Sequence, residues 1–209
     1  MPKEAETFWG KPVFEGNMEA VAAPSDAEVM LRVKDGDDES FARLLSKHRD
    51  PVVNYLYRMV QNAAVAEELA QEVFLRVYRA REHYVPTAKF TTWLYRIATH
   101  VALNSLRDGR HARNVVPLDD PAYVSSRELR DPAPTVEENM VAEAHGWEIR
   151  RAVLTLPEKQ RAAVLLHKYH DMEYKDIAQT LRCSESAVKS LLFHAYNTLR
   201  VRLGHLARK

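Results

Sequence analysis

Apolar residues recur at helical spacing through most of this 209-residue chain, and strand-like alternation is scarce. Apolar positions at i, i+3, i+4 and i+7 predict amphipathic helices with one face in a core. In residues 173–199 two such helices are separated only by a short turn at Arg182 and Cys183. Ser184 suits the start of the second helix, because its hydroxyl can accept a backbone N–H. The pattern predicts an all-α fold that contains a helix-turn-helix, a motif whose second helix lies in the DNA major groove.

The polar face of the predicted second helix carries side chains that suit DNA reading. Lysine donates to guanine or phosphate, serine contacts either, and glutamate accepts from cytosine. The positions on this face are Ser184, Glu185, Ser186, Lys189, Ser190 and His194. The alternative is an αα-hairpin whose polar face meets only water.

Proline and polar residues divide the chain into segments. Residues 1–25 have no clear period, so we expect a mobile tail. Residues 26–108 predict a small helical domain, with a kink or break at Pro51 inside its second helix. Residues 109–136 contain four prolines and predict a flexible linker, which reaches at most roughly 90 Å at about 3.3 Å per residue. Residues 137–209 predict a second small helical domain that holds the helix-turn-helix.

Local signals mark several helix ends. Ser25 is followed by acids in the first helical turn, and Gly36 follows the last apolar position of that helix. Asn62 marks a turn, and Pro157 stands where a helix tolerates proline at its start. These signals predict helices that begin after residues 25 and 62, and one that opens with Pro157 in its first turn.

Charge and composition limit the function classes. The net charge is only +1, but cations gather in residues 96–113 and 182–209, which suits a polyanion held at two places. The lone Cys183 excludes an internal disulfide and fits a reducing compartment, and no apolar run reaches membrane-spanning length. We therefore expect a cytoplasmic protein without membrane insertion. His167 and His170 have no third ligand at motif spacing, so we expect no metal, no cofactor and no enzyme activity.

Three segments in fixed order resemble the extracytoplasmic-function (ECF) sigma factors of bacterial RNA polymerase. They are VAEELAQEVFLRVYR, KFTTWLYRIATHVALNSLR and LPEKQRAAVLLHKYHDMEYKDIAQTLRCSESAVKSLLFHA. The resemblance covers about residues 26–205 and implies sigma region 2 in the first domain and region 4 in the second. It implies a protein that binds core polymerase, through the β′ clamp helices and the β flap, and directs initiation on promoter DNA. It also implies an anti-sigma factor as a regulatory partner.

The resemblance assigns residues to three contacts. The segment that docks on the clamp helices corresponds to Glu68, Leu69, Gln71, Glu72 and Phe74. The part that opens and reads the −10 element corresponds to Tyr84, Lys89, Phe90, Arg96, Asn104, Arg107 and Arg110. Within that set Tyr84 and Phe90 are expected to form a pocket for an unstacked base, whereas Trp93 is expected to pack in the core. The resemblance assigns the −35 element to the helix that contains Lys189, which is expected to contact it through the six polar positions given above.

Two departures from the family pattern concern the helix-turn-helix. Arg182 stands where the family usually has glycine, so the turn is strained by roughly 1 kcal/mol or takes another conformation. Asp171 and Glu173 replace a glycine and a Ser/Thr cap, so we expect a less well capped first helix. A helix-turn-helix regulator that binds DNA alone, or an adaptor that binds only protein, are the alternatives to a sigma factor.

Overall fold

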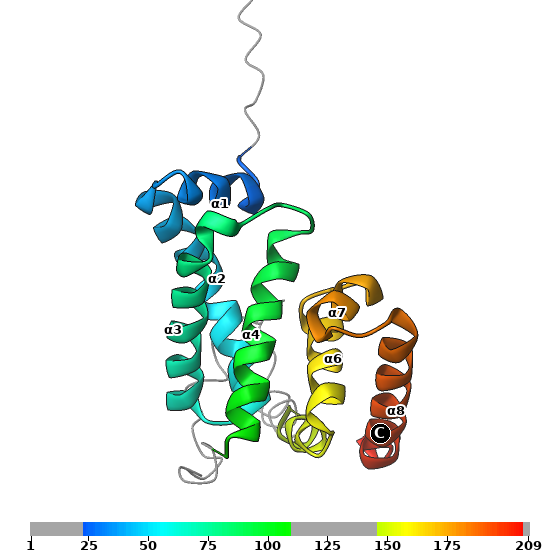
Figure 1. The fold of residues 1–209 in the computed structure, drawn as a ribbon. Coiled ribbons are helices and arrows are strands. Elements are labelled where there is room, and N and C mark those ends of the chain that lie inside the picture. Colours follow the sequence, from blue (N-terminus) through cyan, green and yellow to red (C-terminus); the bar gives the residue numbers. More distant parts are fainter. Residues whose placement is uncertain (1–22, 110–145, 207–209) are drawn as a thin grey trace, which may run out of the picture.

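The computed structural model describes residues 23–109 and 146–206, and these two ranges contain helices but no strand (Figure 1). The N-terminal domain (residues 23–109) comprises α1 (Asp26–Lys34), α2 (Asp38–Val60), α3 (Ala63–Arg79), the 3-10 helix η1 (Arg81–His83) and α4 (Phe90–Arg107). The C-terminal domain (residues 146–206) comprises a helical segment at 146–154, then α6 (Glu158–Tyr169), α7 (Tyr174–Leu181) and α8 (Glu185–Leu203). The predicted all-α class is confirmed. The predicted tail and linker, and the start of the second domain at 137, lie almost wholly outside the described ranges.

The helix starts predicted at Ser25, Asn62 and Ser184 are confirmed, and all three have side-chain caps, whereas Pro157 is the residue before α6 (Glu158–Tyr169) rather than part of its first turn. Ser25 and Glu28 form a capping box: the Ser25 hydroxyl accepts from the Glu28 amide at 3.3 Å, and the Glu28 carboxylate accepts from the Ser25 amide at 2.7 Å. Asn62 caps α3 and Ser184 caps α8 by a single bond each, in which the side-chain oxygen accepts from a backbone amide three residues on. Glu173 makes no side-chain cap on α7, as its departure from the family pattern predicted.

The predicted break at Pro51 is wrong, because α2 is one uninterrupted helix from Asp38 to Val60. Pro51 itself is exposed, whereas His48 before it and Val52, Tyr55 and Leu56 after it are buried. Proline removes one backbone hydrogen bond from a helix interior. Core contacts on both sides of the proline hold the two parts of this helix in one element.

Several turns of the described residues use left-handed backbone. Gly36 (φ 97°) follows α1 and Gly109 (φ 64°) follows α4, where glycine adopts this conformation without steric cost. Arg182 ends α7 at φ 51° and ψ 54°. Of the two options predicted for this arginine, the structure has the strained one. Asp171, ahead of α7, also has positive φ at 47°.

Each domain has its own buried centre. In the N-terminal domain α2, α3 and α4 run alongside one another and α1 lies across one end (Figure 1). Met30, Leu56, Met59 and Leu94 are fully buried there. In the C-terminal domain α8 packs on α6 and α7, with buried residues that include Leu165, Leu166, Ile177, Val188 and Leu192.

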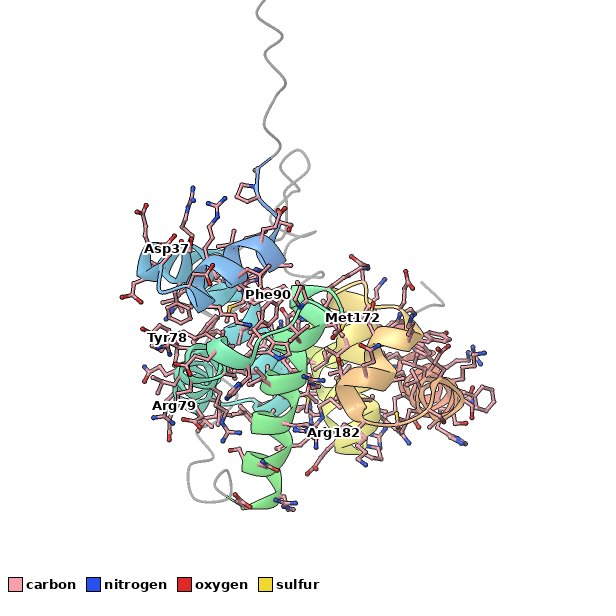
Figure 2. All side chains as sticks on the ribbon, turned by 45° about the horizontal axis from the view of Figure 1, so that its top comes forward. Asp37, Tyr78, Arg79, Phe90, Met172 and Arg182 are labelled. Atoms are coloured by element: carbon pink, nitrogen blue, oxygen red, sulfur yellow. The ribbon has the colours of Figure 1, made fainter. Side chains whose placement is uncertain are left out.

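The two domains also contact each other. Helix α7 packs along α4, and α6 contacts α2. We call this interdomain contact the seam. Arg182, at the turn between α7 and α8, lies beside α4 in Figure 2. The first helix of the helix-turn-helix is therefore in contact with the N-terminal domain, which the pattern of the sequence did not indicate.

Candidate functional site

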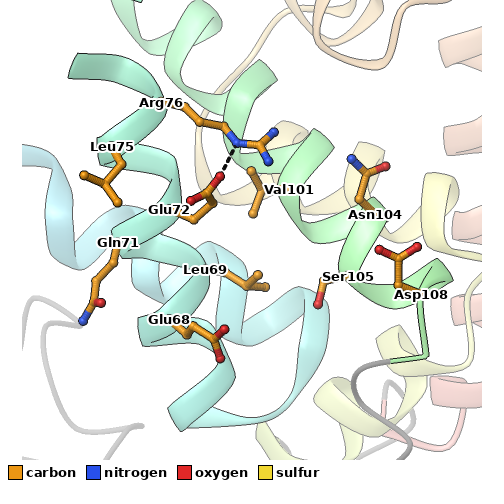
Figure 3. A pocket seen from close by; sticks show the side chains of 10 residues that line it. All are labelled: Glu68, Leu69, Gln71, Glu72, Leu75, Arg76, Val101, Asn104, Ser105 and Asp108. Atoms are coloured by element: carbon orange, nitrogen blue, oxygen red, sulfur yellow. Dashed lines mark hydrogen bonds and ion pairs between the residues drawn. The ribbon is translucent and has the colours of Figure 1, made fainter. Parts of the chain in front are cut away.

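A groove of about 460 Å3 runs between α3 and α4 on the N-terminal domain (Figure 3). Helix α3 contributes acidic and polar side chains to it, and α4 contributes a second polar wall. The lining residues are Glu68, Leu69, Gln71, Glu72, Leu75, Arg76, Val101, Asn104, Ser105 and Asp108. We call it the α3/α4 groove. Its mixture of carboxylates with exposed apolar surface is suited to a protein partner that offers cations and apolar side chains.

Only part of the predicted polymerase-binding set is exposed in this groove. Glu68 and Gln71 are exposed, and Glu72 is partly exposed and ion-paired to the Arg76 Nε at 2.7 Å. Leu69 is 5% exposed and lies in the wall of the groove, while Phe74 is 6% exposed and does not line it. Phe74 belongs to the core, so its prediction as a direct contact is corrected. Both residues lie on apolar helical positions, which sequence alone cannot divide between core and partner.

The groove includes residues that the sequence analysis assigned elsewhere or missed. Asn104, predicted for the −10 element, shares the groove with Glu72 rather than facing a separate surface. Leu75 is 49% exposed, although it is a large apolar residue. The available signal was its place between the core positions Val73 and Val77, which points it away from the core.

The predicted base pocket is closed in this structure. Tyr84 and Phe90 are 2% and 3% exposed, and both rings pack against Trp93, with centroids 5.0 and 5.9 Å from its ring. Neither ring offers a free face to a base, so that prediction is corrected for this conformation, while Trp93 packs as expected. Burial also raises the pKa of the Tyr84 hydroxyl, which has no hydrogen-bond partner among the described residues.

The cations predicted for the −10 element lie along α4. Lys89, just before the helix, and Arg107, in its last turn, are exposed, and Arg96 is partly exposed. Arg107 also donates to the Asn104 side chain at 3.3 Å. Arg110 lies outside the described residues. The structure therefore spreads the predicted −10 cations over the length of α4 rather than gathering them in one pocket.

The −35 face of α8 is open. Five of its six predicted residues, all but the cap Ser184, lie within α8, and all six are exposed, while Val188, Leu192 and Ala195 are buried on the opposite side. The Ser190 hydroxyl donates to the Ser186 carbonyl at 3.2 Å. Phe193, 63% exposed on the same helix, is a feature that the sequence analysis missed. An exposed aromatic ring adds apolar contact area to an otherwise polar reading face.

Positive charge gathers where α4 meets the α7–α8 turn. Burial lowers the pKa of His100, and the guanidinium groups of Arg182, Arg96 and Arg76 lower it further. Helices α3 and α4 of one domain and the turn of the other therefore contribute cations to one region. A phosphate backbone is the ligand class that such a cluster attracts.

Other chemistries find no support in the described parts of the chain. No group of three metal-ligating side chains occurs among residues 23–109 and 146–206. His167 instead contacts the Met172 carbonyl at 3.3 Å, and the ring of His170 packs against that of Tyr95 at a tilt of 40°. In the same ranges no helix is both long and apolar enough to cross a membrane.

Comparison with known proteins gives a consistent result for both domains. The Sigma-70 region 2 family model matches residues 44–112, and the Sigma-70, region 4 model matches residues 147–199. The RNA polymerase sigma factor CarQ of Myxococcus xanthus is 32% identical over 177 residues, which are 85% of this chain and 97% of that protein. The ECF RNA polymerase sigma-E factor of Haemophilus influenzae is 31% identical over 174 residues, 82% of this chain and 91% of that protein.

Two solved structures share the fold. The structure of CnrH in complex with the cytosolic domain of CnrY has a TM-score of 0.61 at 18% identity and covers 87% of this chain and 99% of that one. The sigma factor RpoE in complex with the anti-sigma factor NepR from Bartonella quintana has a TM-score of 0.59 at 18% identity, with coverage of 79% and 98%.

Proposed function

The chain belongs to the ECF family of RNA polymerase sigma factors, and we propose that it divides its contacts with polymerase and promoter among three of the surfaces described above. As a sigma factor it binds core RNA polymerase and directs promoter recognition and initiation. The proposal concerns which residues do so. The α3/α4 groove binds the polymerase, α4 handles the −10 element, and α8 reads the −35 element.

The groove carries the first part of the proposal. Glu68, Gln71 and Glu72 present carboxylate and amide oxygens beside the exposed Leu75. The β′ clamp helices are the partner that the family resemblance implies, and this mixed surface suits a helical partner with cations next to apolar residues. We exclude Phe74 from the contact, because its side chain is buried among core residues.

The −10 contact is assigned to the exposed cations of α4. Lys89, Arg96 and Arg107 are placed along one helix, where they can follow the phosphates of a separated strand. For a base to stack on Tyr84 or Phe90, the loop 84–89 must move away from these rings. Base capture by this protein therefore requires a local rearrangement.

The −35 contact is assigned to the exposed face of α8. Lys189 and Glu185 supply a donor and an acceptor for base edges, and Ser184 holds the start of the helix by its cap. The linker joins this contact to the others in one chain, so that two weak sites act together through effective concentration. An anti-sigma factor is the regulatory partner that we infer, which the complexes of CnrH with CnrY and of RpoE with NepR support.

The match of both family models in one chain carries the proposal, and transcription in vitro tests it. The full chain and core polymerase should together initiate on promoters from a pool of genomic templates, where core alone does not. Glu68→Arg should then weaken binding to core at least tenfold. Glu39→Arg, which changes the charge equally at an exposed position of α2 away from the groove, should not. Equal loss in both variants would remove the groove from the polymerase contact.

A further inference from the structure

One exposed apolar side chain of the N-terminal domain has no part in the contacts assigned so far. Among the large apolar residues of the range 23–109, Leu75 and Val85 are exposed, at 49% and 62%. Leu75 lines the α3/α4 groove, whereas Val85 lies in the loop between η1 and α4, seen as the arch between these two elements in Figure 1. A single exposed apolar residue is common on protein surfaces, so the surroundings of Val85 decide what it does.

The residue before Val85 is anchored through its backbone and its ring. The Tyr84 amide donates to the Arg81 carbonyl at 3.1 Å, and the Tyr84 carbonyl accepts from the Nζ of Lys34, on α1, at 3.3 Å. The ring of Tyr84 is 2% exposed and packs against that of Trp93, with centroids 5.0 Å apart. Val85 therefore follows a residue that is fixed to the domain.

A tight turn comes directly after this anchor. The Thr87 amide donates to the Val85 carbonyl at 2.8 Å, which closes a three-residue turn around Pro86. Proline fixes its own φ and so limits the conformations of the turn. Val85, Pro86 and Thr87 are all exposed, whereas Tyr84 and Phe90 on either side of the loop are buried. The loop thus presents Val85 and Pro86 to solvent, and we call these two residues the apolar tip.

Groups that can bind a DNA backbone lie next to the apolar tip. Lys89, at the end of the loop, is exposed, and Arg96, further along α4, is partly exposed. No side chain caps α4, so the amides of its first turn can also bind a phosphate. An apolar side chain flanked by phosphate-binding groups is the arrangement by which proteins enter a base step while they hold the backbone.

The conformation of the loop decides which part of it can meet DNA first. Tyr84 and Phe90 are buried, so neither can stack on a base until the loop moves. The apolar tip is accessible without any rearrangement. Stacked base pairs lie about 3.4 Å apart, and an apolar side chain that enters between two of them unstacks the step and kinks the duplex. The tip is therefore the part of the loop that can act on DNA before a base is captured.

We propose that Val85, supported by Pro86, is a wedge that enters a base step at the edge of the −10 element and starts the separation of the strands. The inference rests on the proposed assignment of the −10 element to α4 and the loop before it. Lys89 and Arg96 hold phosphates while the step opens, and the anchored Tyr84 prevents the wedge from folding back. Val85 has no polar group to recognise a base edge, so it contributes to strand opening and not to the choice of sequence.

A comparison of duplex and pre-opened templates tests the wedge. A promoter on which the wild-type chain initiates is prepared as a full duplex and with unpaired, mismatched bases over the −10 element. With core polymerase, full-length Val85→Ser should open the duplex roughly tenfold more slowly than wild type, as measured by permanganate oxidation of unpaired thymines. On the pre-opened template the same variant should initiate within about twofold of wild type.

Two further variants control for size and for position. Val85→Ile keeps an apolar tip, so it should open the duplex as fast as wild type. Val201→Ser makes the serine substitution at a valine of α8 that is 85% exposed, and it should change the result on neither template.

The results on the two templates separate the wedge from the proposed function. Equal opening of the duplex by Val85→Ser and wild type would overturn the wedge. An equal loss on both templates would also overturn it, because Val85 would then act on strands that are already apart or on the fold. Opening by Val85→Ile as slow as that by Val85→Ser would show that apolar character is not what matters. Failure of the wild-type chain to initiate on any template would overturn the proposed function, and the wedge with it.

Discussion

The imidazole of His170 packs on the ring of Tyr95 with centroids 4.1 Å apart, although the two residues belong to different domains and are 75 positions apart in the chain. Burial, and after it the positive charge of Arg58, lower the pKa of His170 to about 4, although the charge of Asp171 opposes the shift. Burial raises the pKa of both tyrosines that enclose the ring, Tyr55 and Tyr95, so neither supplies a negative charge that could stabilise an imidazolium. Closure of the seam thus favours a neutral imidazole.

Acidification should therefore open the protein. In the open state the His170 pKa returns toward its usual 6.5, so the open state binds the proton more tightly than the closed state. The contribution of His170 to closure is complete above pH 6.5 and is lost as the pH falls toward about 4. Over this range the ratio of closed to open protein should fall by up to roughly tenfold per pH unit. Energy transfer between dyes on the two domains should fall between pH 7.5 and pH 5.

His170→Gln is the control for this pH dependence. Glutamine does not titrate but has a side chain of similar length, so the change of energy transfer with pH should become smaller. The pKa of His100 at the seam is also lowered, mainly by burial and then by the charge of Arg182. Its titration should leave a weaker pH dependence of the same sign in the glutamine variant. An unchanged transition in the glutamine variant would exclude His170 as the titrating group.

A buried hydrogen bond should contribute measurably to the N-terminal core. The hydroxyls of Tyr55 and Thr99 share a bond of 2.7 Å, and both side chains are almost fully buried. Thr99→Val leaves the tyrosine hydroxyl without a partner and should lower the free energy of unfolding by about 1–3 kcal/mol. Urea denaturation checks this value.

The double variant separates the bond from the shape of the site. Tyr55→Phe with Thr99→Val removes both polar groups, so it should destabilise less than the sum of the single changes. Strict additivity would show that the hydroxyls do not interact.

The helices and their order follow from the sequence because their signals are local. Ser25, Asn62 and Ser184 act on amides within one turn of themselves, and the apolar spacing needs only a neighbouring core. The division of apolar residues between core and surface is different. Leu69 and Phe74 lie at apolar positions of α3 and were both predicted to contact the polymerase, yet both are buried, because packing against other helices decides which apolar side chains face inward.

Neither the closed base pocket nor the seam could be predicted from local sequence patterns, and the reason is the same for both. Tyr84 lies in a loop with no periodic pattern, and its burial depends on Phe90 and Trp93 folding over it. The contact of Arg161 with the Met59 carbonyl joins residues 102 positions apart. A polar residue on a helix is ordinarily expected to face water, so nothing near Arg161 in the sequence indicates a buried carbonyl partner.

Replacing Arg182 by glycine should stabilise the C-terminal domain. The arginine holds φ 51° and ψ 54° at the end of α7, a conformation that costs a non-glycine residue about 1–2 kcal/mol. Glycine loses part of that gain through its more flexible unfolded state, so we expect a net increase of about 0.5–1 kcal/mol in the free energy of unfolding. Arg182→Ala removes the charge but keeps the Cβ, so it should give no such gain. Equal stabilities of the two variants in urea would show that the backbone is not strained.

Loss of Lys189 should change promoter use without changing polymerase binding. Lys189 is exposed on α8, whereas the α3/α4 groove is formed entirely by the N-terminal domain. A contact to a base or phosphate is worth about 1–3 kcal/mol, so Lys189→Ala should reduce transcription from a promoter that depends on its −35 element roughly five- to a hundredfold. Lys168→Ala, at an exposed position of α6, is the charge-matched control.

If Lys189 binds phosphate rather than a base, the loss should be similar for all −35 sequences and the salt slope should fall by about one. A matching loss of affinity for core polymerase would contradict the separation of roles between the two domains.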